Sequence, residues 1–211
     1  MITETVMDKD ISTEEKIKKA AKKVFQKKGF GLTRTRDIAE EADINLALLN
    51  YYYRSKEKLF EIVMQDSMRE MLSYISTIIN DENTSLSEKI DAGVARYIDG
   101  LMENPHLPVF VFSELQANPV KLLDKLGIPD QLIAHSSMYS QLQDQIDKKN
   151  LDLTPLHLFV NLVSLSIFPI MSKPLLSNIH KMEESEYLQF IEERKIMIPI
   201  WLKAMLQLEN T

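Results

Sequence analysis

The stretch from Gly31 to Phe60, GLTRTRDIAEEADINLALLNYYYRSKEKLF, predicts two short helices joined by a tight break and followed at once by a long helix. The break has the sequence Glu-Ala-Asp-Ile at residues 41–44, and Asn45 follows it. An asparagine side chain there can accept hydrogen bonds from the free amides of the next helical turn. We therefore expect a helix over 34–41 capped by Thr33 and a helix over 45–52 capped by Asn45.

Cations stand on both sides of the second short helix, which itself carries no charged residue. Arg34 and Arg36 precede it, and Arg54, Lys56 and Lys58 follow it. A small helix between cations suits insertion into a groove between two phosphate backbones. The pattern indicates a helix-turn-helix that binds double-stranded DNA.

The charge of the chain is unevenly distributed, although its formal total is −6. Residues 1–58 hold 13 Lys and Arg against 10 Asp and Glu, a balance of +3, whereas the remainder holds 12 against 21, a balance of −9. The cations therefore gather where the helix-turn-helix lies. A solvated lysine-rich helix over residues 12–28 explains part of this asymmetry equally well.

Composition favours a helical protein. The 211 residues include only five glycines and eight prolines, few for the frequent turns of an all-β chain, and 45% are hydrophobic. There is no cysteine, which excludes disulfides and thiolate metal sites. The first ten residues are polar, and no apolar run approaches the roughly 18 residues of a membrane span. We expect a cytoplasmic protein without a membrane anchor and without a cofactor.

Apolar residues recur at helical spacing nearly throughout, so we expect an all-α fold. Residues 1–55 are predicted to form the DNA-binding domain, and residues 56–211 a larger helical domain for ligand binding and dimerisation. Pro169 and Pro199 fall inside the last two predicted helices and predict kinks there. The expected helices cover 12–28, 34–41, 45–52, 56–80, 85–103, a short segment around Phe110, 130–149, 155–171 and 184–208, with 119–129 irregular.

The second short helix predicts a division between an inner and an outer face. If Leu49 faces the core, the residues within about 60° of it at 100° per residue are Asn45, Leu46, Tyr52 and Tyr53. Ala47 and Tyr51 then point the opposite way. Leu48 and Asn50 then lie on the flanks. Asparagine can read adenine in a bidentate fashion, and alanine or leucine can touch a thymine methyl. The alternative is that these are ordinary surface residues.

Residues 12–60 resemble the N-terminal DNA-binding domain of the TetR/AcrR family of transcriptional regulators. The resemblance covers about a quarter of the chain. It implies a homodimer whose two recognition helices read the halves of a palindromic operator, and release of the DNA when a small molecule binds the C-terminal domain. The matching residues are Ala20, Ala21, Phe25, Gly29, Phe30, Thr33, Thr35, Ile38, Ala39, Ala42, Ile44, Asn45, Tyr52, Tyr53, Ser55, Lys56, Glu57, Leu59 and Phe60.

The resemblance also implies roles for single residues. Thr35 stands where the family places a hydroxyl that contacts phosphate, and Arg36 where some members reach a base edge. Tyr52 and Lys56 occupy the ring-bearing and lysine positions that hold the DNA backbone.

Three positions depart from the family pattern. Asp43 replaces the turn glycine, Ala47 replaces a common glycine, and Asn50 replaces the usual tyrosine. The identity of the operator bases therefore does not follow from the resemblance.

Two features of the second domain suggest binding surfaces. Residues 158–168 are apolar nearly all round, and an apolar stripe follows from Tyr187 to Met205. The last two long helices are therefore predicted to form the dimer interface. The alternative is that these apolar residues are buried within one subunit. Eleven methionines suit an adaptable apolar pocket for a small molecule, although plain core is the alternative for each residue. The pocket candidates are Met71, Tyr74, Tyr97, Met102, Phe110, Phe112, Met138 and Tyr139.

A ligand-responsive repressor accounts for all these features together. A DNA-binding protein regulated by protein partners is a second possibility. An all-α enzyme is a third, but the chain has no Gly-rich phosphate loop and no nucleophile elbow. Its four histidines lie far apart in sequence, so no metal site is expected.

Overall fold

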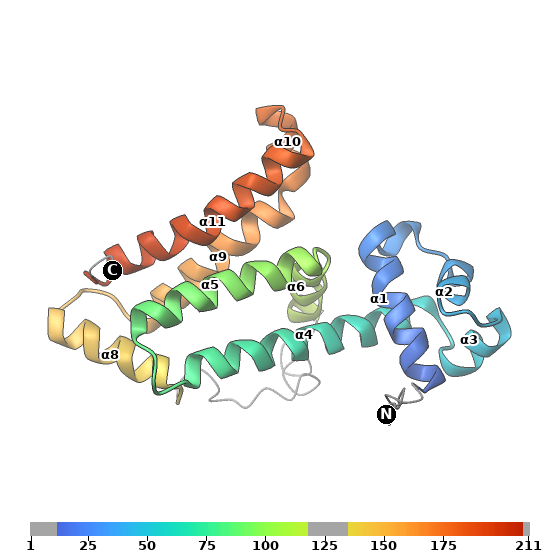
Figure 1. The fold of residues 1–211 in the computed structure, drawn as a ribbon, viewed down its shortest axis with the longest axis horizontal. Coiled ribbons are helices and arrows are strands. Elements are labelled where there is room, and N and C mark those ends of the chain that lie inside the picture. Colours follow the sequence, from blue (N-terminus) through green and yellow to red (C-terminus); the bar gives the residue numbers. More distant parts are fainter. Residues whose placement is uncertain (1–11, 118–134, 209–211) are drawn as a thin grey trace, which may run out of the picture. The chain divides into compact units, whose positions relative to one another are not determined.

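The computed structural model describes residues 12–117 and 135–208, and every regular element within them is a helix (Figure 1). The predicted all-α fold is confirmed. The chain divides into two compact units, of which the first ends at Asp66 and the second begins at Ser67. This boundary lies inside helix α4 (Lys56–Asn80).

The first unit contains α1 (Thr13–Leu32), α2 (Thr35–Glu41), α3 (Leu46–Tyr52) and the beginning of α4. Regular helix in α1 is interrupted at Gly29, whose φ of 73° is one that glycine adopts without strain. The ring of Phe60 lies 5.0 Å from that of Phe25 and 4.8 Å from that of Phe30. The apolar residues that recur at helical spacing along α1 are all buried: Ile17, Ala20, Ala21, Val24 and Phe25.

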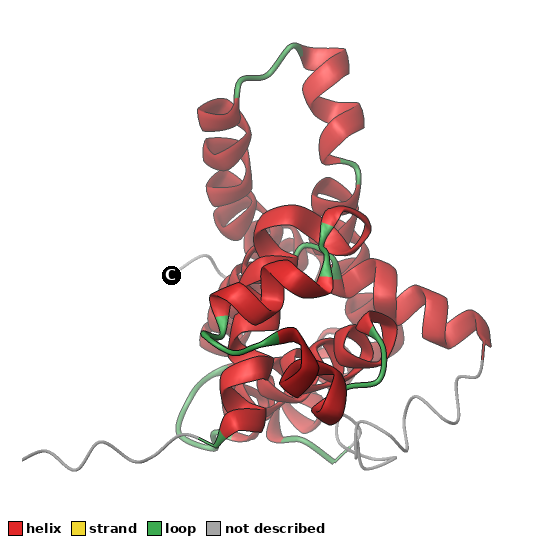
Figure 2. Ribbon diagram, turned by 90° about the vertical axis from the view of Figure 1, so that its right-hand side faces the viewer, coloured by secondary structure: helices red, strands yellow, loops and turns green. Residues whose placement is uncertain are grey.

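In the second unit, α5 (Leu86–Glu103), α9 (Pro155–Met171) and α11 (Glu184–Met205) pack against one another (Figures 1 and 2). The helices α6 (Leu107–Ala117) and α8 (Ser137–Lys149) pack beside them. Their shared core is aliphatic apart from one tyrosine. It comprises Leu86, Ile90, Val94, Ile98, Leu101, Leu142, Ile146, Leu158, Ile170, Tyr187, Ile191, Ile198, Leu202 and Leu206.

The predicted start of one helix is wrong. A helix over 130–149 was expected, but α8 begins only at Ser137, because the Ser136 hydroxyl accepts a hydrogen bond from the Tyr139 amide and caps it. Residues 118–134, which hold the segment expected to be irregular, lie outside the described residues. Helix α10 (Lys173–His180) was not predicted. Pro174 follows the end of α9 at Met171 and also lies in the first turn of α10, where a proline breaks no hydrogen bond.

Helix α10 follows α9 after a bend of 66°. Within residues 12–117 and 135–208, no single helix is long and apolar enough to cross a membrane. The bent pair of α9 and α10 meets that test by length and composition alone.

Helix α9 is apolar on two opposite sides. Leu158 and Ile170 are buried in the core of the second unit. Leu156, Val160 and Phe168 are 65%, 49% and 61% exposed. A second apolar side left exposed in this way is typical of a surface that binds a partner.

A proline inside α9 is accommodated by a side chain from α11. Pro169 has no N–H to donate to the carbonyl of Leu165, four residues earlier. The guanidinium of Arg194 donates to that carbonyl instead, at 2.7 Å. It also lies 4.9 Å from the Trp201 ring, and burial lowers the pKa of Arg194. Arg194 therefore joins α9 to α11 at the position where α9 lacks its own hydrogen bond.

We predict that Arg194→Met destabilises the protein by about 1–3 kcal/mol, because the Leu165 carbonyl loses its donor. Urea unfolding monitored by circular dichroism measures the loss. Pro169→Ala restores an N–H at residue 169, so the same Arg194→Met change should cost clearly less in a Pro169→Ala background. An equal cost in both backgrounds would show that the carbonyl does not depend on Arg194.

Candidate nucleic-acid interface

The break between α2 and α3 is closed by backbone hydrogen bonds. The Ala42 amide donates to the Ile38 carbonyl at 2.9 Å, and the Ile44 amide donates to the Ala39 carbonyl at 3.0 Å. Asp43 sits between them with φ of 52°, a left-handed conformation that aspartate tolerates better than most residues. The departure from glycine at this position is therefore compatible with the turn.

Helix α3 is seven residues long and is held at both ends. Asn45 accepts a hydrogen bond from the Leu48 amide at 2.8 Å, which confirms the predicted cap. Leu49 is 1% exposed and Tyr53 is 4% exposed, so both face the core as expected. The Tyr53 hydroxyl donates to the Glu14 carboxylate of α1 at 3.4 Å. Burial first, and then the charge of Glu14, raises the pKa of Tyr53 to about 12.

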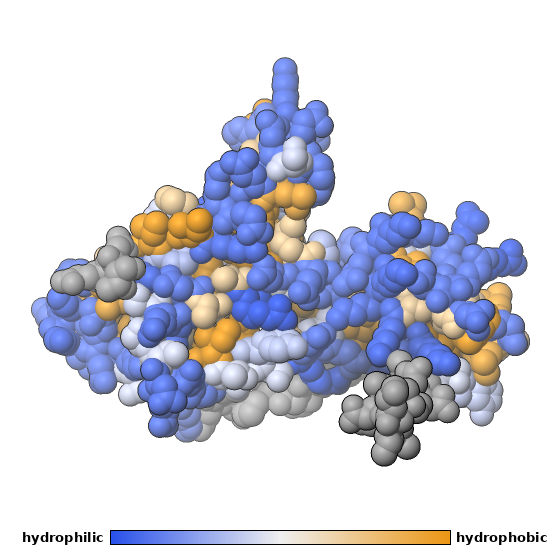
Figure 3. Space-filling view, viewed as in Figure 1, coloured by the Kyte–Doolittle hydropathy of each residue, from blue (hydrophilic) through white to orange (hydrophobic). Residues whose placement is uncertain are grey.

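The outer side of α3 is accessible and uncharged. Ala47 and Asn50 are exposed, and Leu48 is half-buried. Tyr51 is 81% exposed and Tyr52 41%, and their rings meet edge to face at 5.5 Å. Figure 3 shows apolar surface in the region of α2 and α3 with hydrophilic residues around it.

Helix α2 begins at Thr35, which is half-buried, and continues with the exposed Arg36. The prediction that Thr33 caps this helix is wrong. Thr33 is buried, and its hydroxyl donates to the Gly29 carbonyl at 2.7 Å. The cap residue is Arg34, whose amide donates to the Asp37 carboxylate at 2.9 Å. This bond, followed by the Lys28 ammonium 3.1 Å away, lowers the pKa of the Asp37 carboxyl.

Lys56 has an intramolecular role that its sequence position did not reveal. Its ammonium donates to the carbonyls of Phe30 and Thr33 at 2.9 and 3.0 Å, and lies 4.2 Å from the centre of the Phe30 ring. Lys56 thus fastens the beginning of α4 to the end of α1. An ammonium has three N–H donors, so one remains for a phosphate oxygen.

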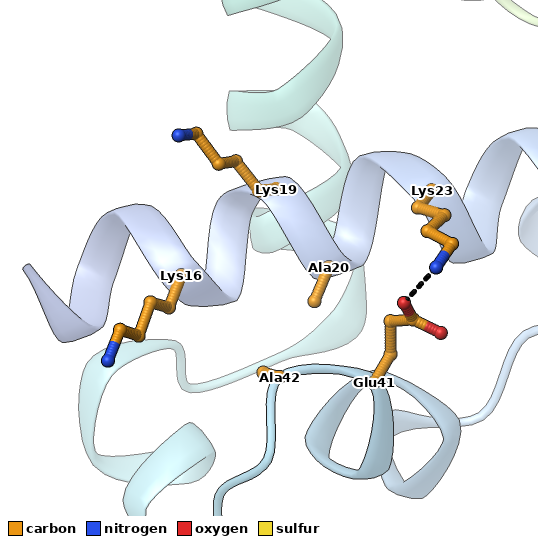
Figure 4. A pocket seen from close by; sticks show the side chains of 6 residues that line it. All are labelled: Lys16, Lys19, Ala20, Lys23, Glu41 and Ala42. Carbon is orange, nitrogen blue, oxygen red and sulfur yellow. Dashed lines mark hydrogen bonds and ion pairs between the residues drawn. The ribbon is translucent and has the colours of Figure 1, made fainter. Parts of the chain in front are cut away.

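The lysines of α1 lie beside the turn of the helix-turn-helix. A shallow hollow of about 260 Å³ is lined by Lys16, Lys19, Ala20, Lys23, Glu41 and Ala42. Figure 4 shows Lys23 reaching across to Glu41, with which it forms an ion pair. Lys16 and Lys19 are exposed and form no ion pair within the described parts of the chain. The positive charge of α1 is therefore partly neutralised by acidic side chains of the same unit.

The predicted pocket residues are spread over several environments in the second unit. Met71 and Phe110 are buried. Tyr97, Met102 and Met138 are partly buried against the shared core, and burial raises the pKa of Tyr97 to about 12. Tyr139 is half-buried. Tyr74 and Phe112 are 48% and 46% exposed, and Arg96 lies 4.3 Å from the Tyr74 ring.

A second hollow, of about 580 Å³, lies between α5 and α11. Two of its lining residues, Lys203 and Asp91, form an ion pair at 2.6 Å, and the lining residue Lys195 pairs with Asp99 at 2.5 Å. None of the predicted pocket residues lines this hollow. Among residues 12–117 and 135–208, no group of three or more His, Cys, Asp or Glu residues could hold a metal ion.

Comparison with known proteins finds similarity to bacterial transcriptional regulators. Residues 17–63 match the family model of the bacterial regulatory proteins of the tetR family. The chain is 25% identical over 201 residues to YttP of Bacillus subtilis, named a probable HTH-type transcriptional regulator, and the match covers 92% of this chain and 94% of that protein. A second Bacillus subtilis protein of that type, YfiR, is 28% identical over 90 residues, 43% of this chain and 41% of that protein.

Two solved structures have a similar fold. A TetR/AcrR-family transcriptional regulator from Thermobifida fusca superposes with a TM-score of 0.62 at 16% identity, covering 88% of this chain and 96% of that one. The fatty acid degradation regulator FadR from Bacillus halodurans superposes with a TM-score of 0.58 at 16% identity, covering 90% and 96%.

We predict that Asn45→Ala lowers the stability of the first unit by about 1 kcal/mol, because the Leu48 amide loses its acceptor. Urea unfolding of the full chain measures the change. Asn45→Asp is the matched control, since its carboxylate can accept the same bond, and it should retain most of the stability. If the alanine and aspartate variants unfold at the same urea concentration, the cap does not stabilise α3.

Proposed function

Because this chain belongs to the TetR/AcrR family of DNA-binding transcriptional regulators, we propose that it is a repressor that a small apolar effector releases from a palindromic operator. The observation that carries the proposal is the arrangement of α3. Leu49 and Tyr53 anchor the helix, while an uncharged face stays accessible between exposed cations. A short helix presented in this way suits the major groove.

We assign the contacts on DNA in two groups. Thr35, Tyr52 and Lys56 contact phosphate oxygens and so fix the position of the unit on the duplex. Ala47, with Leu48 and Asn50 on the two flanks of the outer face, faces base edges, where the amide can bind adenine and the apolar groups can meet a thymine methyl. Tyr51, which lies opposite the core beside Ala47, and the exposed Arg36 of α2 are assigned to base edges as well.

We further propose that the chain forms a homodimer through the outer sides of α9 and α11. Leu156, Val160 and Met171 of α9 are exposed and lie within about 60° of one another at 100° per residue. Ile196, Ile200 and Trp201 of α11 are 65%, 37% and 38% exposed. Figure 3 shows separate apolar patches in the region of α9 and α11, with hydrophilic surface between them. A twofold pair of these helices buries both surfaces and presents two copies of α3 to two half-sites.

The effector is proposed to bind in the second unit among its methionine and aromatic residues. Met71 and Phe110 are buried there, and Tyr97 supplies a phenol in a largely apolar environment. Selection of bound sequences from random DNA, repeated in the presence of candidate metabolites, tests operator and effector together. Binding that no metabolite weakens would favour regulation by a protein partner.

The two groups of DNA contacts are separable by mutation. We expect Tyr52→Ala to weaken binding to every sequence by roughly tenfold, the effect of losing one phosphate hydrogen bond. Asn50→Ala should cost about 1–3 kcal/mol on the preferred operator and much less on variants at the contacted base pair. Fluorescence anisotropy with a panel of operator variants at fixed salt distinguishes the two patterns. An unchanged order of preference for Asn50→Ala would show that Asn50 reads no base.

The proposed dimer also has a direct test. Ile196→Glu with Ile200→Glu places two buried charges in the dimer interface and should yield monomers at micromolar concentration. Sedimentation velocity measures the change against the wild-type chain. Both residues are exposed within one chain, so circular dichroism should show unchanged helix content. A wild-type chain that is monomeric at micromolar concentration would contradict this architecture.

A further inference from the structure

Helix α10 and the adjoining ends of α9 and α11 form a projecting arm of the second unit (Figures 1 and 2). In Figure 1, α10 lies at the end of the α9 and α11 pair that is remote from the C-terminus. It packs on α9, and none of its residues is buried.

One side of the arm carries four exposed apolar side chains, which we name the arm stripe. Phe168 and Met171 of α9 are 61% and 42% exposed, and Leu175 and Ile179 of α10 are 54% and 64% exposed. They follow one another at intervals of three, four and four residues, the spacing of a single side of a helix on each part of the bent pair.

The arm is fixed by polar contacts that leave the stripe uncovered. The Lys173 ammonium pairs with the Glu184 carboxylate at 2.7 Å and lies 4.7 Å from the Tyr187 ring. The Tyr187 hydroxyl donates to the Pro169 carbonyl at 3.4 Å. Lys173 is the one Lys, Arg, Asp or Glu within α10, so the stripe offers apolar contact and no free charge to a partner.

We propose that the arm stripe clasps a second copy of this chain, as an extension of the α9 and α11 dimer interface. The inference rests on the dimer proposed above. Met171 lies about 20° around α9 from Val160, and Phe168 about 80° from it, at 100° per residue. The stripe therefore extends the outer side of α9 toward the arm, beyond the exposed Ser164. A second copy seated on α9 is therefore adjacent to the arm.

The area of the exposed apolar surface on α9, α11 and the arm also supports contact with a second copy of this chain. Eight exposed apolar side chains on α9 and α11 offer roughly 700 Å², slightly less than the roughly 800 Å² per partner of a standard stable interface. The arm stripe adds roughly 400 Å², which brings the surface above that size. The eight residues are Leu156, Phe159, Val160, Ile196, Met197, Ile200, Trp201 and Met205.

The experiment compares dimer dissociation constants of full-length variants by sedimentation velocity over a dilution series. Leu175→Gln with Ile179→Gln should raise the dissociation constant at least tenfold, with unchanged helix content. Leu32→Gln is the control, because Leu32 is 80% exposed but lies in the first unit. Its dissociation constant should stay within twofold of the wild-type value.

A second measurement reports burial directly. The chain has no cysteine, so Ile179→Cys provides a single site for an environment-sensitive dye. The dye emission should shift to the blue on dimerisation and should not shift in the Ile196→Glu, Ile200→Glu background.

One result would overturn the clasp and leave the dimer proposal intact. In that result the wild-type chain dimerises, the glutamine variants at 175 and 179 have the wild-type dissociation constant, and the emission of the dye at position 179 does not shift on dimerisation. A wild-type chain that stays monomeric overturns both proposals. If the glutamine variants change only the affinity for DNA, the stripe serves another partner and the clasp is likewise overturned.

Discussion

The surface proposed to face DNA depends on the burial of Leu49 and Tyr53. A helix of seven residues is too short to be stable in water by itself, so α3 exists because tertiary contacts hold it. Leu49 fixes which side of the helix faces inward, and Tyr53 connects its end to α1 through Glu14. Once these two residues are fixed, the outward direction of Asn50 and Tyr51 follows from helical geometry.

The second unit meets a different constraint, because α9 is apolar on both sides and contains a proline. The core covers one side, and Arg194 supplies the hydrogen bond that Pro169 removes. The helix pair is thereby rigid while its second apolar side is still uncovered. This combination suits a subunit interface, since a preformed surface loses little conformational entropy on association.

Local patterns predicted the first unit well because its interactions are local. The cap at Asn45, the buried side of α1 and the left-handed turn at Asp43 each depend on residues within a few positions. The predictions failed where distant residues decide. Thr33 is turned to the Gly29 carbonyl, and Lys56 reaches back 26 residues to Phe30; neither contact has a periodic signal. Helix α10 was not predicted because a proline is common both just after the end of one helix and in the first turn of the next, and Pro174 occupies both positions.

The ion pairs of the first unit refine what its positive charge can do. Lys18, Lys23 and Lys28 are each paired with a carboxylate of α2 or α4, so these three ammonium groups are engaged within the unit. Within the described residues, Arg36 and Arg54 form no ion pair, and they flank α3 on its two sides in sequence. Non-specific phosphate attraction is correspondingly modest, and its strength would fall steeply with salt. In the proposed function, discrimination of an operator depends on the uncharged face of α3, which offers one amide, one phenol and a few methyl groups.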